Sequence, residues 1–390
     1  MSDDLREMLR NTIDGETMRG HAFAYANSEE TLFCEAFGSL STAGTPMRTD
    51  SVCIIASMTK AVTGAAAMQL VEQGRLQLDM PAGDVCPYLR DVQVFEGYDE
   101  NADAILRPPR TPVTLRHLLT HTSGFVYDLW NPAFGELVEK LGLPSFTTRQ
   151  KRALEVPLMF DPDERWEYGI GIDWVGQMVE AVSGTTLGEY VAANITGPLQ
   201  MHSTAFTPDE DMLARLAETS QRQEDGTLRT IPPDENPLAA EAPEFEMGGG
   251  GLLSTTVDYL RFLRAILRGG ELDGARILQA ETVALMCQNS IGALDVVELP
   301  SAAPALSNHA ELFPGAVKKW GLTFQITEAA CATGRAPGTL MWAGLTNCYY
   351  WIDREKDLTG VYVNQIYPFA DERCLEAYYQ AETLAYSARS

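Results

Sequence analysis

Strand-like segments stand at both ends of the chain, and this placement constrains the fold more than any other feature of the sequence. Apolar runs typical of strands occur at 21–27 and 31–37 near the N-terminus, and at 320–326, 339–342, 348–352 and 359–365 near the C-terminus. Residues 78–245 instead carry helical patterns joined by loops that contain proline and glycine. We therefore expect an α+β or α/β chain in which residues 1–77 and 246–390 build one sheet domain and residues 78–245 form an inserted, mainly helical domain.

The charge of the chain limits its partners. Its 390 residues include 29 Lys and Arg against 54 Asp and Glu, a formal net charge of −25. A surface this acidic repels phosphates, so we expect neither nucleic acid nor a membrane as a partner. No apolar run approaches the ~18–20 residues of a membrane span, and the start of the chain, M-S-D-D-L-R, lacks the features of a secretory signal. The expected location is the cytoplasm, and the sequence leaves the oligomeric state open.

Cysteine and histidine spacings indicate no metal site. The seven cysteines are an odd number with no C-x-x-C spacing, which is typical of small buried side chains in a reducing compartment rather than of a disulfide framework or a zinc site. His117 and His121 are four residues apart, but the glutamate of the H-E-x-x-H motif is missing between them. We expect no metal and no cofactor, and a role for His121 in fixing the following loop.

A serine and a lysine at i and i+3, Ser57 and Lys60, stand at the start of a helix that runs to Gly74. That spacing puts both side chains on one helix face, and the apolar flanking residues predict that the helix is buried. Burial and the positive end of the helix dipole both disfavour an ammonium group, so Lys60 becomes available as a neutral base for a nucleophilic Ser57. The tetrad alone also fits a capping serine and a lysine that reaches solvent, so the surrounding motifs have to decide.

Three further segments are characteristic in sequence and follow one another along the chain. They are L-V-E-Q-G-R-L-Q-L-D at 70–79, T-L-R-H-L-L-T-H-T-S-G at 114–124 and G-G-G-G-L-L-S-T-T-V-D at 248–258. Together with S-M-T-K at 57–60, the S-x-x-K motif of serine β-lactamases and penicillin-binding proteins, they give a chain that resembles the class C β-lactamase-like serine hydrolases. Within that group it is most similar to the esterase branch, the family VIII carboxylesterases. The resemblance implies a β-lactamase/transpeptidase-like fold, with an antiparallel sheet flanked by helices, an inserted all-α domain, and the active site between the two domains.

The resemblance also implies a catalytic tyrosine. Tyr25-Ala26-Asn27 matches the family's Y-x-N pattern literally but precedes the serine and ends a strand, so we exclude it. Tyr168-Gly169-Ile170 follows a proline-containing loop and precedes a helix, as the family pattern requires. We expect Lys60 to push Tyr168 toward its phenolate, so that it acts as general base and then as acid to the leaving group. Ile170 replaces the family asparagine at the substrate, which removes a polar contact.

The third family motif, K-T-G, has no literal match. Trp342-Ala343-Gly344 is its counterpart by resemblance, as in the W-x-G of the esterase branch. Trp342 then replaces the cation that holds a substrate carboxylate, and the small Gly344 lets a substrate carbonyl approach the strand. The backbone N–H groups of Ser57 and Leu345 are the expected oxyanion donors.

These features favour a carboxylesterase that cleaves small-molecule esters of short to medium acyl chains through an acyl-Ser57 intermediate. Three alternatives stay open: an acyltransferase of the same fold, a weak β-lactamase or D-amino-acid peptidase, and a scaffold without activity. The chain contains no G-x-S-x-G, the nucleophile elbow of α/β-hydrolases.

Overall fold

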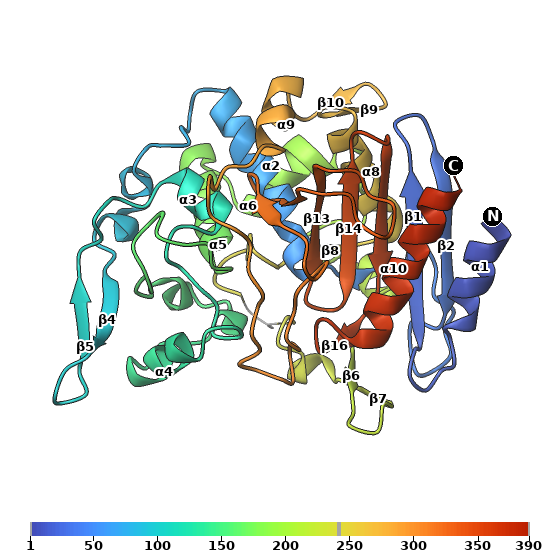
Figure 1. Cartoon of the computed structure of the whole chain (residues 1–390), viewed down its shortest axis with the longest axis horizontal. Helices are drawn as coiled ribbons and strands as arrows, with labels where there is room; N and C mark the ends of the chain where they lie inside the picture. Colours follow the sequence, from blue (N-terminus) through green and yellow to red (C-terminus); the bar gives the residue numbers. More distant parts are fainter. Residues whose placement is uncertain (1, 240–242, 389–390) are drawn as a thin grey trace.

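A computed structural model describes residues 2–239 and 243–388, and its centre is one seven-stranded antiparallel sheet (Figure 1). The strand order is β11-β12-β13-β14-β15-β1-β2. The bounds are β1 Gly20–Ala26, β2 Thr31–Gly38, β11 Lys318–Trp320, β12 Gln325–Thr327, β13 Thr339–Gly344, β14 Cys348–Asp353 and β15 Leu358–Val363. Because β1 pairs with β15, from Ala22 opposite Val363 to Ala26 opposite Thr359, the two ends of the chain build a single sheet, as predicted.

The predicted strand 320–326 is wrong, because the chain reverses direction inside it. β11 ends at Trp320 and β12 begins at Gln325, and the two pair with each other. At the turn the backbone of Gly321 lies so close to Met286 that a Cβ on it would be 2.2 Å from the Met286 carbonyl oxygen, and Thr323 has a φ of 79°. Apolar periodicity does not report such a turn when every residue in it is buried.

Helices cover the sheet. α1 (Ser2–Asn11) and α10 (Glu372–Ser387) pack against each other beside the sheet (Figure 1), and α8 (Thr256–Leu267) packs against β1, β14 and β15. Two short strands, β3 (Cys53–Ile54) and β8 (Leu253–Ser254), pair next to α8. A small hairpin and a helix follow α8 in sequence, namely β9 (Glu271–Leu272), β10 (Ala275–Arg276) and α9 (Ala280–Met286).

Helix α2 (Thr59–Glu72) is buried over its first twelve residues, as its sequence predicts. Four of these residues are alanine, which has the highest helix propensity. Gly64 permits close packing, because a Cβ on it would lie 2.4 Å from Cγ2 of Thr323. The predicted stop at Gly74 is confirmed by a φ of 69°, which glycine adopts without strain. α2 therefore carries Lys60, the last residue of the S-x-x-K tetrad, into the interior.

Residues 78–239 hold five α-helices: α3 (Leu115–Thr120), α4 (Pro132–Lys140), α5 (Gly171–Ser183), α6 (Leu187–Val191) and α7 (Glu210–Ala214). They also hold two hairpins that the sequence did not predict, β4 (Val94–Tyr98) with β5 (Ala104–Arg107), and β6 (Ser220–Arg222) with β7 (Leu228–Thr230). β6 pairs in parallel with β16 (Ile366–Tyr367). The division into domains 1–77 with 246–390 and 78–245 stays a prediction, and its residues 1, 240–242 and 389–390 lie outside the described residues.

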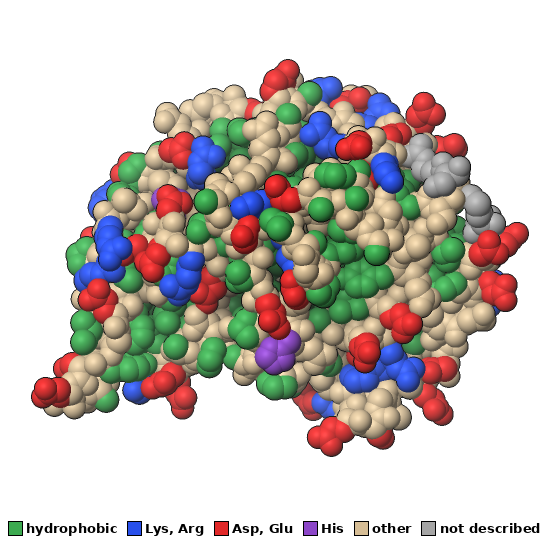
Figure 2. Space-filling model, viewed as in Figure 1, with side chains coloured by type: hydrophobic (Ala, Val, Ile, Leu, Met, Phe, Trp, Pro, Cys, Tyr) green, Lys and Arg blue, Asp and Glu red, His purple; other side chains and the backbone are tan. Residues whose placement is uncertain are grey.

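Three further observations concern the surface, the cysteines and the helices. Figure 2 shows acidic side chains spread over one face of the molecule and interspersed with Lys and Arg. All seven cysteines are free thiols, and three of them, Cys34, Cys287 and Cys331, are partly exposed. Within residues 2–239 and 243–388, no helix combines the length and the apolar character needed to cross a bilayer.

Candidate active site

Ser57 lies where strand β3 passes into the buried helix α2. A single 3₁₀ turn, Ala56–Met58, joins the two elements. Ala56 has a φ of 44°, a left-handed conformation that is uncommon for a residue with a Cβ and marks a tight change of direction. Ser57 stays partly exposed while its neighbours Ala56 and Met58 are buried. Ser57 is therefore accessible from the pocket that it lines.

Lys60 contacts the serine, as the spacing predicts. Its Nζ donates to Ser57 Oγ over 3.2 Å, to the Tyr127 hydroxyl over 3.1 Å and to the Gly249 carbonyl oxygen over 2.6 Å. The side chain is 1% exposed. Burial lowers the pKa of Lys60 from 10.5 to about 7, and the nearby carboxylate of Asp173 limits this fall. A neutral amine next to Ser57 Oγ is therefore accessible near neutral pH.

Tyr168 lies in the same cluster, but its pKa is shifted in the direction opposite to the predicted one. Burial raises its pKa well above 10, although hydrogen bonds with Ser57 and with Trp342 oppose this rise. Lys60 Nζ lies 4.7 Å from the centroid of the tyrosine ring. The direction of this shift is opposite to the expected one, because loss of solvation disfavours the phenolate. The role expected for Tyr168 stays a prediction. The shift favours the neutral phenol, whose hydroxyl can donate a proton.

His121 holds the loop that carries Tyr168. Its backbone has a φ of 58° and ends helix α3. The amide N–H of Glu167 donates to the His121 carbonyl oxygen over 3.0 Å, and the amide N–H of Gly169 donates to His121 Nδ1 over 3.3 Å. The residues before and after Tyr168 are thus both bonded to one histidine. His117 instead contacts Asp163 Oδ2 over 2.9 Å, and the described residues contain no cluster of three or more metal-binding side chains.

The hairpin of β13 and β14 brings the third motif to the serine. A Cβ on Gly344 would lie 2.3 Å from the Ile55 carbonyl oxygen, so only glycine permits this approach. Leu345 lines the same pocket as Ser57, and the use of their two backbone N–H groups as oxyanion donors stays a prediction. Trp342 donates from Nε1 to the Tyr168 hydroxyl over 3.0 Å. Its indole N–H is therefore engaged with the phenol.

Trp342 and Ile170 line other cavities. Trp342 borders a small void with Gln325 and Phe369, and Ile170 borders a second void with Phe134 and Ser145 among others. Neither is among the residues that line the pocket at Ser57. Their predicted contacts with substrate stay predictions. The excluded tyrosine, Tyr25, lies in β1 and stacks on Phe33, with ring centroids 6.1 Å apart.

Three residues of the site were missed by the sequence analysis. Tyr127 and Gly249 both accept from Lys60, and Asp173 Oδ1 accepts from the Gly249 N–H over 2.8 Å. Asp173 is fully buried, its Oδ2 has no partner among the described atoms, and burial raises its pKa to about 6. An acid in the apolar run G-I-D-W-V-G, five residues after Tyr168, was an available signal; Tyr127 carries none in its spacing.

The pocket at Ser57 is apolar. Besides Ser57 and Tyr127, its walls are Ala56, Leu129, Trp130, Phe146, Leu238, Met247, Gly249, Gly250 and Leu345. None of these described residues is charged, so the pocket suits an uncharged apolar group. A serine hydroxyl, a lysine of lowered pKa and a tyrosine hydroxyl thus meet beside an apolar cavity, an arrangement that suits acyl transfer.

Comparisons with known proteins agree with this chemistry. The sequence profile of the family described as beta-lactamase matches residues 5–385. The monacolin J acid methylbutanoyltransferase of Aspergillus terreus is 31% identical over 346 residues, which cover 84% of this chain and 80% of that enzyme. The lovastatin esterase of Penicillium rubens is 31% identical over 361 residues, which cover 88% and 85%. Among solved structures, unliganded simvastatin synthase (LovD) from Aspergillus terreus gives a TM-score of 0.86 at 28% identity and covers 99% of this chain and 98% of that one.

Proposed function

The chain belongs to the beta-lactamase family, and from this premise we propose that it is a serine acyltransferase that moves a short, uncharged acyl group from an ester through Ser57 to an alcohol. The observation that carries the proposal is the 3.2 Å contact between Ser57 Oγ and the Nζ of a buried Lys60. A base of lowered pKa within hydrogen-bond reach is what a serine nucleophile requires.

Each step in the formation of acyl-Ser57 can be assigned to a residue of the site. Neutral Lys60 takes the proton of Ser57 while Oγ attacks the ester carbonyl, and the N–H groups of Ser57 and Leu345 stabilise the developing oxyanion. When the tetrahedral intermediate collapses, Tyr168 gives its proton to the departing alkoxide and recovers one from Lys60. The products of this half-reaction are an alcohol and acyl-Ser57.

The second half-reaction repeats the first with a new alcohol. The acceptor gives its proton to neutral Lys60 and attacks the acyl carbon. When this second tetrahedral intermediate collapses, Ser57 Oγ leaves and takes that proton back from Lys60. The uncharged lining of the pocket, which includes Leu129 and Leu345, suits an acceptor with an apolar body. Similarity to a methylbutanoyltransferase over most of both chains supports transfer in place of the carboxylesterase reading of the sequence.

Hydrolysis is the second candidate function. The same acyl-Ser57 is released by water in a carboxylesterase, and the similarity to a lovastatin esterase at 31% identity favours this alternative. A β-lactamase or peptidase has less support, because Trp342 takes the place of the lysine that holds a substrate carboxylate in that branch of the family.

Product analysis separates the two candidates. The protein is incubated with p-nitrophenyl butyrate in the presence and absence of 1-hexanol, and butyric acid and hexyl butyrate are quantified by gas chromatography. Hexyl butyrate as the main product, formed faster than by Ser57→Ala, supports the acyltransferase. Butyric acid alone at every alcohol concentration assigns a carboxylesterase, and equal rates for wild type and Ser57→Ala refute both.

A further inference from the structure

One carboxamide, that of Gln365, joins the two segments that carry the proposed oxyanion donors. Its Oε1 accepts from the Ile54 amide N–H over 3.0 Å, and its Nε2 donates to the Ile54 carbonyl oxygen over 3.0 Å and to Thr346 Oγ1 over 3.2 Å. Ile54 is three residues before Ser57, and Thr346 directly follows Leu345. The Gln365 side chain therefore forms hydrogen bonds both with the segment that leads to Ser57 and with the segment that follows Leu345.

Thr346 closes this bridge. Its hydroxyl donates to the Ile54 carbonyl oxygen over 2.8 Å, so that oxygen accepts from both Gln365 and Thr346. Thr346 is fully buried and Gln365 is 5% exposed, so water cannot readily replace these bonds. β3 itself has only two residues in ladder pairing, with β8. The side chains of Gln365 and Thr346 therefore add hydrogen bonds that hold Ile54 beside the turn between β13 and β14.

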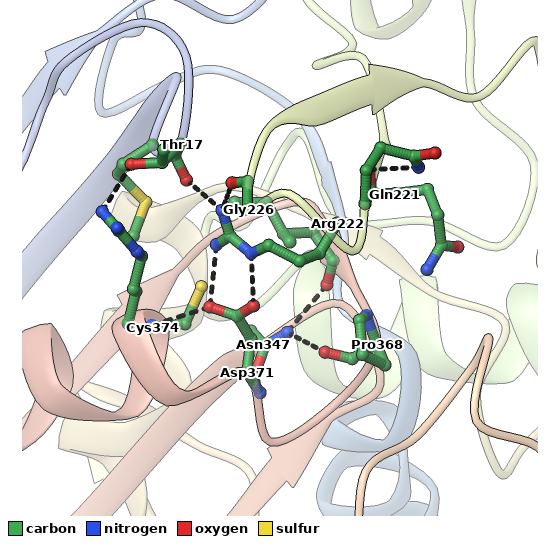
Figure 3. Close-up of polar contacts among 12 residues, drawn as sticks. Thr17, Gln221, Arg222, Gly226, Asn347, Pro368, Asp371 and Cys374 are labelled. Atoms are coloured by element: carbon green, nitrogen blue, oxygen red, sulfur yellow. Dashed lines mark hydrogen bonds and ion pairs between the residues drawn. The ribbon is translucent and has the colours of Figure 1, made fainter.

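Asn347, which follows Thr346 in the turn between β13 and β14, is held by a separate set of hydrogen bonds. It has a φ of 60°, and its Nδ2 donates to the carbonyl oxygens of Ile366 and Pro368, each over 2.8 Å (Figure 3). Its Oδ1 accepts from the Asp371 amide N–H over 3.1 Å. Asp371 is in turn paired with Arg222, as Figure 3 shows. Leu345 is thus followed in sequence by two buried, hydrogen-bonded residues.

We propose that Gln365 is a positioning residue that sets the spacing between the N–H groups of Ser57 and Leu345. The inference rests on the proposed function, because an oxyanion has to form at Ser57 for the spacing to matter. Both donors must lie about 2.7–3.1 Å from one oxygen, and a displacement of about 1 Å can lower a rate by about 10²-fold. Gln365 touches no substrate; it acts through Ile54 and Thr346.

The first test compares two buried glutamines. Gln365→Met removes the carboxamide and keeps the length of the side chain. Gln69→Met is the matched control, because Gln69 is also buried and its Nε2 bridges two backbone carbonyl oxygens, those of Asn194 and Ile277, over 3.0 and 2.8 Å outside the site. With p-nitrophenyl butyrate we expect Gln365→Met to lower kcat by about 30- to 100-fold with KM within threefold, and Gln69→Met to stay within threefold in both.

A second substrate separates positioning from general damage. The thionoester analogue carries C=S in place of C=O, and its larger sulfur gains little from two N–H donors placed for oxygen. Loss of donor spacing therefore lowers the ester rate more than the thionoester rate. We expect kcat/KM for the ester divided by kcat/KM for the thionoester to fall about tenfold in Gln365→Met and to be unchanged in Gln69→Met.

A threonine pair keeps the test decisive if Gln365→Met does not fold. Thr346→Val removes the hydroxyl and should lower the ratio, whereas Thr346→Ser retains it and should restore the wild-type ratio. An unchanged ratio in both Gln365→Met and Thr346→Val overturns the proposal even though Ser57→Ala is inactive. Full activity of Ser57→Ala would instead refute the proposed function itself.

Discussion

The indole N–H of Trp342 donates to the hydroxyl of Tyr168 over 3.0 Å, and the two ring centroids lie 4.8 Å apart. The residue that stands in place of the lactamase lysine is thus bonded to the tyrosine proposed as proton donor. We therefore expect Trp342 to affect catalysis through the orientation of the Tyr168 hydroxyl, in addition to any contact with substrate.

Tyr168→Phe and Trp342→Phe should both slow turnover, to different extents. Removing the phenol hydroxyl should lower kcat by at least ~10²-fold, the lower range for general acid–base catalysis. Trp342→Phe replaces the indole by a smaller ring without the N–H donor and leaves the Tyr168 hydroxyl present but less well oriented, so we expect a smaller loss, about 10-fold. The double variant should be no slower than Tyr168→Phe alone, because both changes act on the same proton. Additive losses in steady-state kinetics would contradict this coupling.

Activity should depend on the neutral form of Lys60. The pKa of Lys60 is about 7 instead of 10.5, so kcat/KM should rise as pH increases through about 7 and be lost below it. Asp173 raises the pKa of Lys60, so Asp173→Asn should move this rise to lower pH, by about one unit. The carboxamide can still accept from the Gly249 N–H. Asp258→Asn is a matched control, since Asp258 is buried but bonded to Ser203 and Thr204; an equal shift in both variants would exclude a specific effect of Asp173.

Esters should be preferred over lactams. The wild-type protein should process p-nitrophenyl butyrate with a kcat/KM at least about 100-fold above that for a chromogenic cephalosporin, a difference of ~2.7 kcal/mol in transition-state stabilisation. Trp342→Lys should narrow the ratio, because it adds a cation near the site and removes the donor to Tyr168. Comparable values for both substrates in the wild type would restore the lactamase interpretation.

The buried ion pair of Arg335 and Glu382 should be essential for stability. Arg335 donates to both carboxylate oxygens over 2.6 Å, and both side chains are fully buried. Glu382→Gln leaves the guanidinium without its countercharge and should lower the free energy of unfolding by about 3–5 kcal/mol. The control is Glu235→Gln, whose exposed pair with Arg229 should contribute less than about 1 kcal/mol. Urea denaturation of both variants measures the difference, and similar midpoints would contradict it.

The sequence could predict contacts between site residues that are close along the chain, but not contacts between residues that are far apart. Ser57 and Lys60 are three residues apart, so helix geometry alone brings them together. Tyr127 and Asp173 reach the same lysine only through the packing of α2 against elements of the inserted segment, 67 and 113 positions along the chain from Lys60. No local spacing encodes such contacts.

The pKa of Tyr168 shows a second limit. A sequence identifies the charged neighbour, but the desolvation that dominates follows from burial among Trp130, Trp166, Trp320 and other aromatic rings. The direction of the shift therefore required the three-dimensional arrangement.

The pairing of β1 with β15 has a consequence for synthesis of the protein on the ribosome. Ala22 is paired with Val363, 341 positions later. At about 5–20 residues per second, the partner strand is made roughly 17–70 s after β1. During that interval β1 and β2 form at most a two-stranded hairpin, which is marginally stable in water and leaves the edge of β1 that β15 later covers unpaired, besides the outer edge of β2. Slower or paused translation should therefore prolong the exposure of an aggregation-prone strand edge.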